Sequence, residues 1–485
     1  MSAAEAPADT TESTHRPEMP GRERWYTARS GPLTYLPAAL GALLAVVTST
    51  AFRQLTHPFL SHDDWDTILP ATPWRSDLLY VRQLAEGRWL NYVWWRTGGP
   101  LLTPVTATLL YFGAYSAFVV RLARSITGGW WGLLIAAALF VSPMVAEAAY
   151  WPAILGPSMV VLAASTWLLP LCRHRVPRLL IWMSLSTLMA MLTYQPVALL
   201  IFLVLMLEER HRPLRQLAAL AVGFCVVWVG AIVVTFTLNW FSFGTFGVRP
   251  QAWRKPNELA SFADLVQNLG AVGTHFQMVI EATPVAVILG LASILVRLLL
   301  PALRTSGVLL LLSVLVMSAL ESLSTIQAGF LTPYRSSMWV WVVVVVAVFG
   351  LTELTPRAGR ILAAVGLIVV LASGSTYWIH SVSEHQQRLD TYDEMAWRTK
   401  QLLEKSGSTK AVIVGSKRDW SYYVFLQQAT YLRSRTAFET GVTPSYCRPA
   451  TCALARDPDV IDERSDVFVD RDRVIIRPPA SEWNN

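Results

Sequence analysis

The sequence predicts an all-α polytopic membrane protein that ends in a small α/β domain. Three observations support this fold class: the composition, a series of long apolar runs, and a polar tail. Apolar residues make up 53% of the 485 residues and charged residues only 15%, whereas a soluble globular protein carries about 25% charge. Mean hydropathy is +0.40. A surface this poor in charge cannot face water throughout, so the soluble, disordered, collagen-like and disulfide-scaffold classes are excluded.

The N-terminal leader, residues 1–32, is polar and rich in Ala, Glu, Thr, Pro and Arg. It contains no apolar core of the kind that a cleavable signal peptide needs. We therefore expect a disordered leader on the cytoplasmic side.

The transmembrane domain is expected over residues 33–379. A bilayer core of about 30 Å needs about 20 helical residues for each span, and about 11 apolar runs come near that length. The runs fall at 33–52, 100–120, 130–147, 153–171, 179–195, 196–207, 216–238, 284–301, 306–323, 336–352 and 361–379.

Arginines in alternate loops predict the orientation of these spans. The net charge is +7, and its distribution indicates topology rather than nucleic-acid binding, because loops rich in Arg and Lys stay in the cytoplasm. An odd number of spans then places the C-terminal domain outside. The arginines concerned are Arg121, Arg124, Arg173, Arg175, Arg178, Arg210, Arg212, Arg215, Arg304, Arg357 and Arg360.

Three segments are expected outside the membrane: the loops 53–99 and 239–283, and the domain 380–485. In the second loop, residues 257–269 predict a short amphipathic helix that ends at Gly270. In the C-terminal domain, residues 384–406 predict a helix capped by Ser383 and stopped by Gly407. A buried strand is expected over 411–414 and a hairpin over 467–469 and 474–476.

The first outer loop holds an acidic cluster, Ser61-His62-Asp63-Asp64-Trp65-Asp66. Neighbouring carboxylates repel one another, so part of the cluster is expected to have a raised pKa, as a general base for a sugar hydroxyl requires. The alternative is a solvated acidic loop. An apolar stripe at helical spacing follows and predicts an interfacial helix. Its members are Trp74, Leu78, Val81, Ala85 and Trp89.

Several short motifs, taken in order, resemble the GtrII-type glucosyltransferases within the GT-C class. The first is HDDWD, followed by EGRWLNYVWW, in which Gly87-Arg88-Trp89 matches the family's Gly-Arg-aromatic step. The later ones are VSPMVAEAAYW (141–151), MLTYQPVALL (191–200), LTPYRSSMW (331–339, with an inserted Tyr334) and YDEMAWRTKQLL (392–403). The resemblance covers residues 33–405, and the last 80 residues match no family motif.

The resemblance implies that a lipid monophosphate carries the sugar on the outer face and that an acid of the first outer loop deprotonates the acceptor. Asp63 or Asp64 would be the base, with Asp64 favoured and Asp66 in reserve. The leaving phosphate needs cations, and Arg335 is the first candidate; interfacial snorkelling is its alternative explanation. Further phosphate candidates are Arg88, Arg249, Arg254 and Lys255.

Other polar residues fall at the outer ends of the spans and could contact sugar. Glu147 is expected either to bind an acceptor hydroxyl or to pair with an arginine of the site, since an acid there is costly alone. Tyr194 and Gln195 either bind sugar or form the turn before Pro196. Trp65 is a further candidate for sugar binding. His275 and Glu281 lie near the next span, and His275 is expected to be an ordinary interfacial residue.

Two cysteines lie in the C-terminal domain, Cys447 and Cys452. On the outer side of the membrane they could form a disulfide, and two unpaired thiols are the alternative. No spacing of a zinc site and no Walker-type loop occurs, so we expect neither a metal nor a nucleotide cofactor.

Together with the resemblance, these features predict a membrane glycosyltransferase of a bacterial plasma membrane, and the resemblance implies that it inverts configuration. It would move a hexose from a polyprenyl-phosphate-linked sugar donor to an envelope glycan or glycolipid acceptor. The resemblance implies this donor and implies that the hexose is glucose. Membrane lipids are expected partners and nucleic acid is not. A transporter or flippase for a lipid-linked saccharide is the first alternative, and a non-catalytic assembly subunit is the second.

Overall fold

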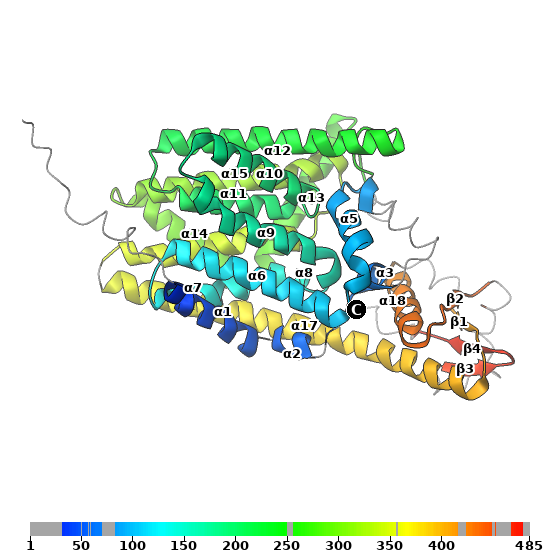
Figure 1. Ribbon diagram of the computed structural model, residues 1–485. Helices are drawn as coiled ribbons and strands as arrows, with labels where there is room; N and C mark the ends of the chain where they lie inside the picture. Colours follow the sequence, from blue (N-terminus) through cyan, green and yellow to red (C-terminus); the bar gives the residue numbers. More distant parts are fainter. Residues whose placement is uncertain are drawn as a thin grey trace, which may run out of the picture.

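The computed structural model describes residues 32–49, 51–56, 58, 60–69, 83–249, 256–355, 357–415, 423–448, 452 and 467–478. The chain is mostly helical, and a small four-stranded sheet lies at one end of the helix bundle (Figure 1). The predicted leader, residues 1–32, lies outside the described residues except for Pro32.

The helices of the N-terminal part run as follows: α1 (Leu36–Thr48), α2 (Ala51–Thr56), α3 (His62–Ile68), α5 (Trp89–Gly98), α6 (Pro104–Ile126), α7 (Trp131–Phe140), α8 (Pro143–Ala148) and α9 (Pro152–Cys172). Those of the second part are α10 (Val176–Met191), α11 (Pro196–Glu208), α12 (Leu214–Phe243), α13 (Phe262–Ala282), α14 (Pro284–Leu299), α15 (Arg304–Ala328), α16 (Met338–Phe349) and α17 (Ala358–Ser406). A 3-10 turn, η5 (Tyr334–Ser337), precedes α16.

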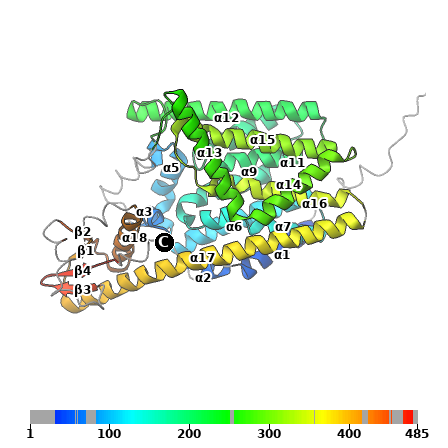
Figure 2. The ribbon, with the colours of Figure 1, turned by 180° about the vertical axis from the view of Figure 1, so that it is seen from behind.

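Within the described ranges, six helical segments are long and apolar enough to cross a membrane. They are α6, α9, α12, α15, α17 and the segment Tyr334–Glu353 around α16. A seventh span is possible where α13 and α14 meet at an angle of 102°, which Figure 2 shows as a sharp turn from one helix into the next. Pro284 accounts for the break, because proline lacks the N–H that would continue α13.

Each of the predicted apolar runs falls on a helix. The runs beyond the six long helices and α14 correspond to the shorter apolar helices α1, α7, α10 and α11. Close helix packing is visible where α1 meets α7, since a Cβ at Gly41 would overlap the carbonyl oxygen of Leu133. Small residues at such contacts let membrane helices approach closely. Eleven spans remain a prediction.

Three predicted helix boundaries were wrong. Residues 384–406 do not form a separate helix, because α17 continues from Ala358 to Ser406 without a break; it does end at Gly407, whose φ is +66°. The helix predicted over 257–269 begins at Phe262, after the cap Ser261, and runs through Gly270 to Ala282. Helical hydrogen bonding in a packed bundle outweighs the cost of about 1 kcal/mol for one internal glycine.

The predicted interfacial helix could be followed only in part, since residues 70–82 lie outside the described residues. Ala85 and Trp89 do not share one helix. The chain turns at Gly87, where φ is +82°, and α5 starts at Trp89. A positive φ favours glycine, which explains the residue type at this turn.

The predicted strand and hairpin of the C-terminal domain are confirmed. The sheet has the order β2-β1-β4-β3 and contains β1 (Ala411–Ile413), β2 (Ser445–Tyr446), β3 (Val467–Asp470) and β4 (Arg473–Ile476). β1 is parallel to β2 and β4, whereas β3 and β4 pair antiparallel. A further helix, α18 (Tyr423–Thr440), connects β1 to β2 and packs against both α17 and α3.

Candidate functional site

The acidic cluster folds into the short helix α3 and docks on the start of α9. Asp64 is fully buried, and its carboxylate accepts the backbone N–H groups of Ala153 at 3.1 Å and Ile154 at 2.9 Å. The first amides of a helix lack partners within the helix, so Asp64 satisfies two of them in α9. Burial raises the pKa of the Asp64 carboxyl well above its usual range, although the hydrogen bonds from the two backbone N–H groups lower that pKa.

Asp63 occupies a different environment from its neighbour. Its side chain is 26% exposed, and its Oδ1 lies 3.1 Å from Nε2 of His62. The side chain of Asp66 lies outside the described part of the structure. Geometry therefore separates the acids into a buried group that holds α9 and a partly exposed group beside a histidine.

Trp65 is buried between α3 and α18. It is 2% exposed, and its ring packs against Tyr431 and Phe438 of α18, at centroid distances of 6.2 and 5.2 Å. Arg435 of the same helix lies 5.4 Å from the Trp65 ring. The prediction that Trp65 contacts sugar is therefore wrong, because its ring is buried in the contact between α3 and α18.

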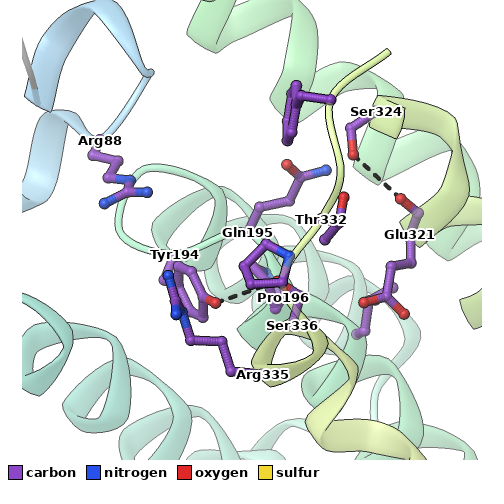
Figure 3. Close-up of a pocket in the computed structure, with 12 residues that line it drawn as sticks. Arg88, Tyr194, Gln195, Pro196, Glu321, Ser324, Thr332, Arg335 and Ser336 are labelled. Carbon is purple, nitrogen blue, oxygen red and sulfur yellow. Dashed lines mark hydrogen bonds between the residues drawn. The ribbon is translucent and has the colours of Figure 1, made fainter. Parts of the chain in front are cut away.

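Four of the predicted binding residues line one cavity of about 110 Å³ at this end of the bundle (Figure 3). Arg88 reaches it from the turn before α5, Tyr194 and Gln195 come from the turn between α10 and α11, and Arg335 comes from η5. We call it the arginine cavity. Its other polar lining residues are Glu321, Ser324, Thr332 and Ser336.

Arg335 contacts Glu147 and Trp151. Its Nη1 donates to Oε1 of Glu147 at 2.8 Å, and its guanidinium lies 4.2 Å from the ring centroid of Trp151. Glu147 is therefore the pairing partner of an arginine of the site, one of its two predicted roles. Trp151 lies just before Ala153, so the same stretch of chain contacts both Arg335 and Asp64.

Arg88 is positioned by contacts between distant parts of the chain. The Leu90 N–H donates to the carbonyl of Leu192 at 2.9 Å, and Trp89 Nε1 donates to Asn239 Oδ1 of α12 at 2.9 Å. Arg88 itself pairs with Glu86 at 3.1 Å. These bonds bring the start of α5 beside the turn that carries Tyr194 and Gln195.

Tyr194 and Gln195 also form the turn that the sequence offered as their alternative role, since α10 ends at Met191 and α11 begins at Pro196. Tyr194 Oη lies 3.3 Å from Ser336 Oγ, as the dashed line in Figure 3 shows. Both roles are compatible, because a helix break leaves polar groups at the cavity wall.

A buried polar cluster that begins in the wall of the arginine cavity was missed. Glu321 of α15 accepts from Ser337 Oγ at 2.9 Å and from Trp339 Nε1 at 2.8 Å, and His275 Nε2 lies 3.3 Å from its Oε1. His275 also contacts the Thr332 carbonyl at 2.8 Å. His275 is thus not an ordinary interfacial residue. The sequence did contain a signal: Glu321 is a single acid within an apolar run, and an unpaired acid is costly in a membrane, so a buried partner was to be expected.

The remaining candidates lie elsewhere. The Arg249 N–H bonds the Ala85 carbonyl at 2.8 Å, and its side chain contacts Thr245 rather than the cavity. Arg254 and Lys255 lie outside the described residues. Glu281 accepts from Gln277 at 2.7 Å. A disulfide joins Cys447 and Cys452, whose Cα atoms are 5.2 Å apart.

At the opposite ends of α6, α9 and α11, predicted cytoplasmic arginines gather around an acid. Arg121 Nη2 lies 2.6 Å from Glu208 Oε1, and Arg173 Nη1 lies 3.0 Å from Glu208 Oε2. The bundle therefore has one end with arginine–glutamate pairs between helices and another with the arginine cavity and α3.

No protein-family model, no curated protein and no solved structure matches this chain. In the part of the chain that the structure describes, no group of three or more His, Cys, Asp and Glu side chains could hold a metal ion.

Proposed function

We propose that the chain is an inverting GT-C-type membrane glycosyltransferase with about eleven spans. It moves a hexose, glucose in the family that it resembles, from a polyprenyl phosphate to a cell-envelope glycan or lipid-linked acceptor. The observation that carries the proposal is the arginine cavity, which combines Arg88 and Arg335 with Tyr194 and Gln195 next to the segment that anchors α3.

The arginine cavity suits the phosphate of the donor. Charged hydrogen bonds from Arg to phosphate are strong and often bidentate, and Arg88 and Arg335 reach the cavity from two sides of the turn at Tyr194 (Figure 3). Gln195 and Thr332 offer neutral groups for sugar hydroxyls. Arg335 donates to Glu147 through Nη1. A guanidinium carries five N–H donors, so it can hold Glu147 and phosphate at the same time.

Asp63 is the better candidate for the base, since Asp64 is buried and already accepts two amides. In the proposed step the acceptor O–H gives its proton to the Asp63 carboxylate. The acceptor oxygen forms a bond to the anomeric carbon, while the anomeric C–O bond to phosphate breaks and leaves its electron pair on the phosphate oxygen. Inversion follows from attack opposite the leaving group.

The orientation is part of the proposal. The cluster of Arg121, Arg173 and Glu208 would lie at the cytoplasmic face of a bacterial plasma membrane, because arginine-rich loops stay inside. The arginine cavity, α3 and the C-terminal domain would then lie on the outer side, where a lipid-linked sugar is presented.

The test is complementation of a deletion strain with the wild type, Asp63→Asn and the matched control Glu404→Gln, which changes an exposed acid on the same outer side. Each variant is checked for equal membrane abundance, and the envelope glycan is analysed for sugar substituents. We expect Asp63→Asn alone to lack a specific sugar. A complete glycan in cells with Asp63→Asn contradicts the assigned base.

A transporter of lipid-linked saccharide is the second candidate, and the buried Glu321–His275 pair favours it, because charges inside the spans often mark transport pathways. Proteoliposomes that contain a fluorescent lipid-linked glucose separate the two functions. Loss of flipping in Glu321→Gln, with flipping retained in Asp63→Asn, supports transport; release of polyprenyl phosphate only when acceptor is added supports transfer.

A further inference from the structure

A second cavity, of about 70 Å³, lies where the C-terminal domain meets the acidic helix. α3, the outer part of α17 and α18 form its walls, and we call it the tail cavity. Figure 1 shows these three elements together at one end of the bundle. The lining residues are Ser61, His62, His385, Arg388, Leu389, Tyr392, Gln427, Gln428 and Tyr431.

One polar group in the wall of the tail cavity has no hydrogen-bond partner among the residues that the structure describes. The Gln428 side chain is 5% exposed, and its Nε2 makes no hydrogen bond to any described residue. A buried donor without an acceptor costs about 1–3 kcal/mol, so native proteins rarely keep one. An acceptor oxygen supplied by a bound molecule would satisfy this amide.

The rest of the wall combines aromatic faces with a few polar groups. Tyr392 and Tyr431 are buried, and the Tyr431 hydroxyl is held by Asp393 at 2.7 Å. His385 is stacked on Tyr150 with ring centroids 4.0 Å apart, which fixes its orientation. Rigid aromatic rings and a small number of convergent hydrogen-bonding groups are typical of sites for small polar molecules such as sugars.

The tail cavity is next to the candidate base. His62 lines the cavity, and its Nε2 lies 3.1 Å from Asp63 Oδ1. His385 and Arg388 face His62 from α17. A hydroxyl of a molecule in this cavity would therefore be close to the Asp63 carboxylate.

We propose that the tail cavity binds one sugar unit of the acceptor, with Gln428 donating to a hydroxyl oxygen and His62 beside the hydroxyl that reacts. The proposal rests on the proposed transferase function and adds to it that the C-terminal domain, through α18, builds the acceptor site. The donor phosphate occupies the separate arginine cavity.

The experiment measures sugar binding directly, without a turnover assay. The full-length protein in lipid nanodiscs is mixed with the methyl α-glycosides of glucose, galactose and mannose, and saturation-transfer NMR reports binding. We expect at least one glycoside to bind and Gln428→Met to weaken that binding about fivefold, the effect of one lost hydrogen bond. Gln387→Met, which changes an exposed glutamine of α17, is the matched control and should bind as the wild type does.

Thermal unfolding distinguishes a binding role of Gln428 from a structural one. Because Nε2 has no partner among the described residues, Gln428→Met should keep or raise the melting temperature while sugar binding falls. A lower melting temperature with unchanged glycoside binding overturns the proposal. Displacement of the glycoside by farnesyl phosphate also overturns it, since the ligand would then share the donor site.

The two proposals can fail separately. Glycoside binding that depends on Gln428, in a protein that never consumes a polyprenyl-phosphate sugar, supports the tail cavity and contradicts the transferase. Sugar transfer with the same acceptor KM in Gln428→Met and wild type supports the transferase and contradicts the tail cavity as the acceptor site.

Discussion

Asparagine substitutions at the neighbouring acids Asp63 and Asp64 of α3 should affect different properties, the rate of transfer in one case and the stability of the fold in the other. Asp63→Asn is expected to slow transfer strongly and leave the fold intact, whereas Asp64→Asn is expected to weaken the fold and reduce transfer only as folded protein is lost. The reason is the geometry: Asp63 is 26% exposed beside His62, and Asp64 is buried under two backbone amides of α9.

The magnitudes follow from the contacts that each change removes. Asn at position 64 keeps one acceptor oxygen and turns its NH₂ towards the second amide, so one of the two hydrogen bonds is lost and a buried N–H is left without its acceptor. We expect a destabilisation of about 1–3 kcal/mol. Asp63→Asn removes a partly exposed contact with His62, for which about 0.2–1 kcal/mol is expected. Loss of a general base lowers the rate about 10²- to 10⁴-fold.

Both quantities can be measured on the same purified preparations. Fluorescence-monitored thermal unfolding in detergent gives the stability order, and release of polyprenyl phosphate from a radiolabelled lipid-linked glucose gives the rate per folded molecule. The reasoning is refuted if Asp64→Asn is as stable as the wild type and inactive, because Asp64 would then be the base despite its burial. Equal activity in wild type and Asp63→Asn refutes the assignment from the other side.

Three further predictions concern the same end of the molecule. Burial raises the pKa of Asp64 above its value in the unfolded chain. The contribution of Asp64 to stability is therefore fully present below the unfolded pKa and is lost as the pH rises through the folded pKa. The free energy of unfolding of Asp64→Asn, measured between pH 4 and 8, should lack this decline. Arg335→Gln should leave Glu147 unpaired at a cost of about 3–5 kcal/mol and raise the donor KM, whereas the double variant with Glu147→Gln should regain stability but not donor affinity, as thermal unfolding and initial rates will show. Replacing Cys447 and Cys452 by serine opens a short loop, for which about 2 kcal/mol is expected; limited proteolysis of the C-terminal domain should quicken while transfer persists.

Hydropathy located the helices well, because burial in a bilayer is imposed residue by residue along the chain. Hydropathy did not predict that the last apolar helix continues into a polar segment. α17 keeps helical geometry from Ala358 to Ser406, and it packs against α18, which is a separate segment of the chain. The strands over 411–413 and 467–476 were predictable because short β-branched runs bounded by polar turns are local signals.

The candidate site was predictable in its residue types and less so in its roles. Arg88, Tyr194, Gln195 and Arg335 gather around one cavity, although no local pattern connects the turn before α5 with η5. The Glu321–His275 pair was missed, because its two members come from different helices, α13 and α15. Pairings of this kind depend on helix packing, which single-sequence periodicity does not encode.

The order of residues in α3 gains a physical meaning from its three surroundings. His62 faces the tail cavity, Asp64 holds the first amides of α9, and Trp65 packs on α18. In a helix, successive side chains point about 100° apart, so one turn can contact three different elements. Asp63 is the member of this turn whose carboxylate is left at the surface between them, beside His62. A disturbance of α18 should therefore reach Asp63 through Trp65. We expect Trp65→Ala to lower the transfer rate, because the Trp65 ring packs on Phe438 and on Tyr431 in the wall of the tail cavity. An unchanged rate in that variant would separate the C-terminal domain from catalysis.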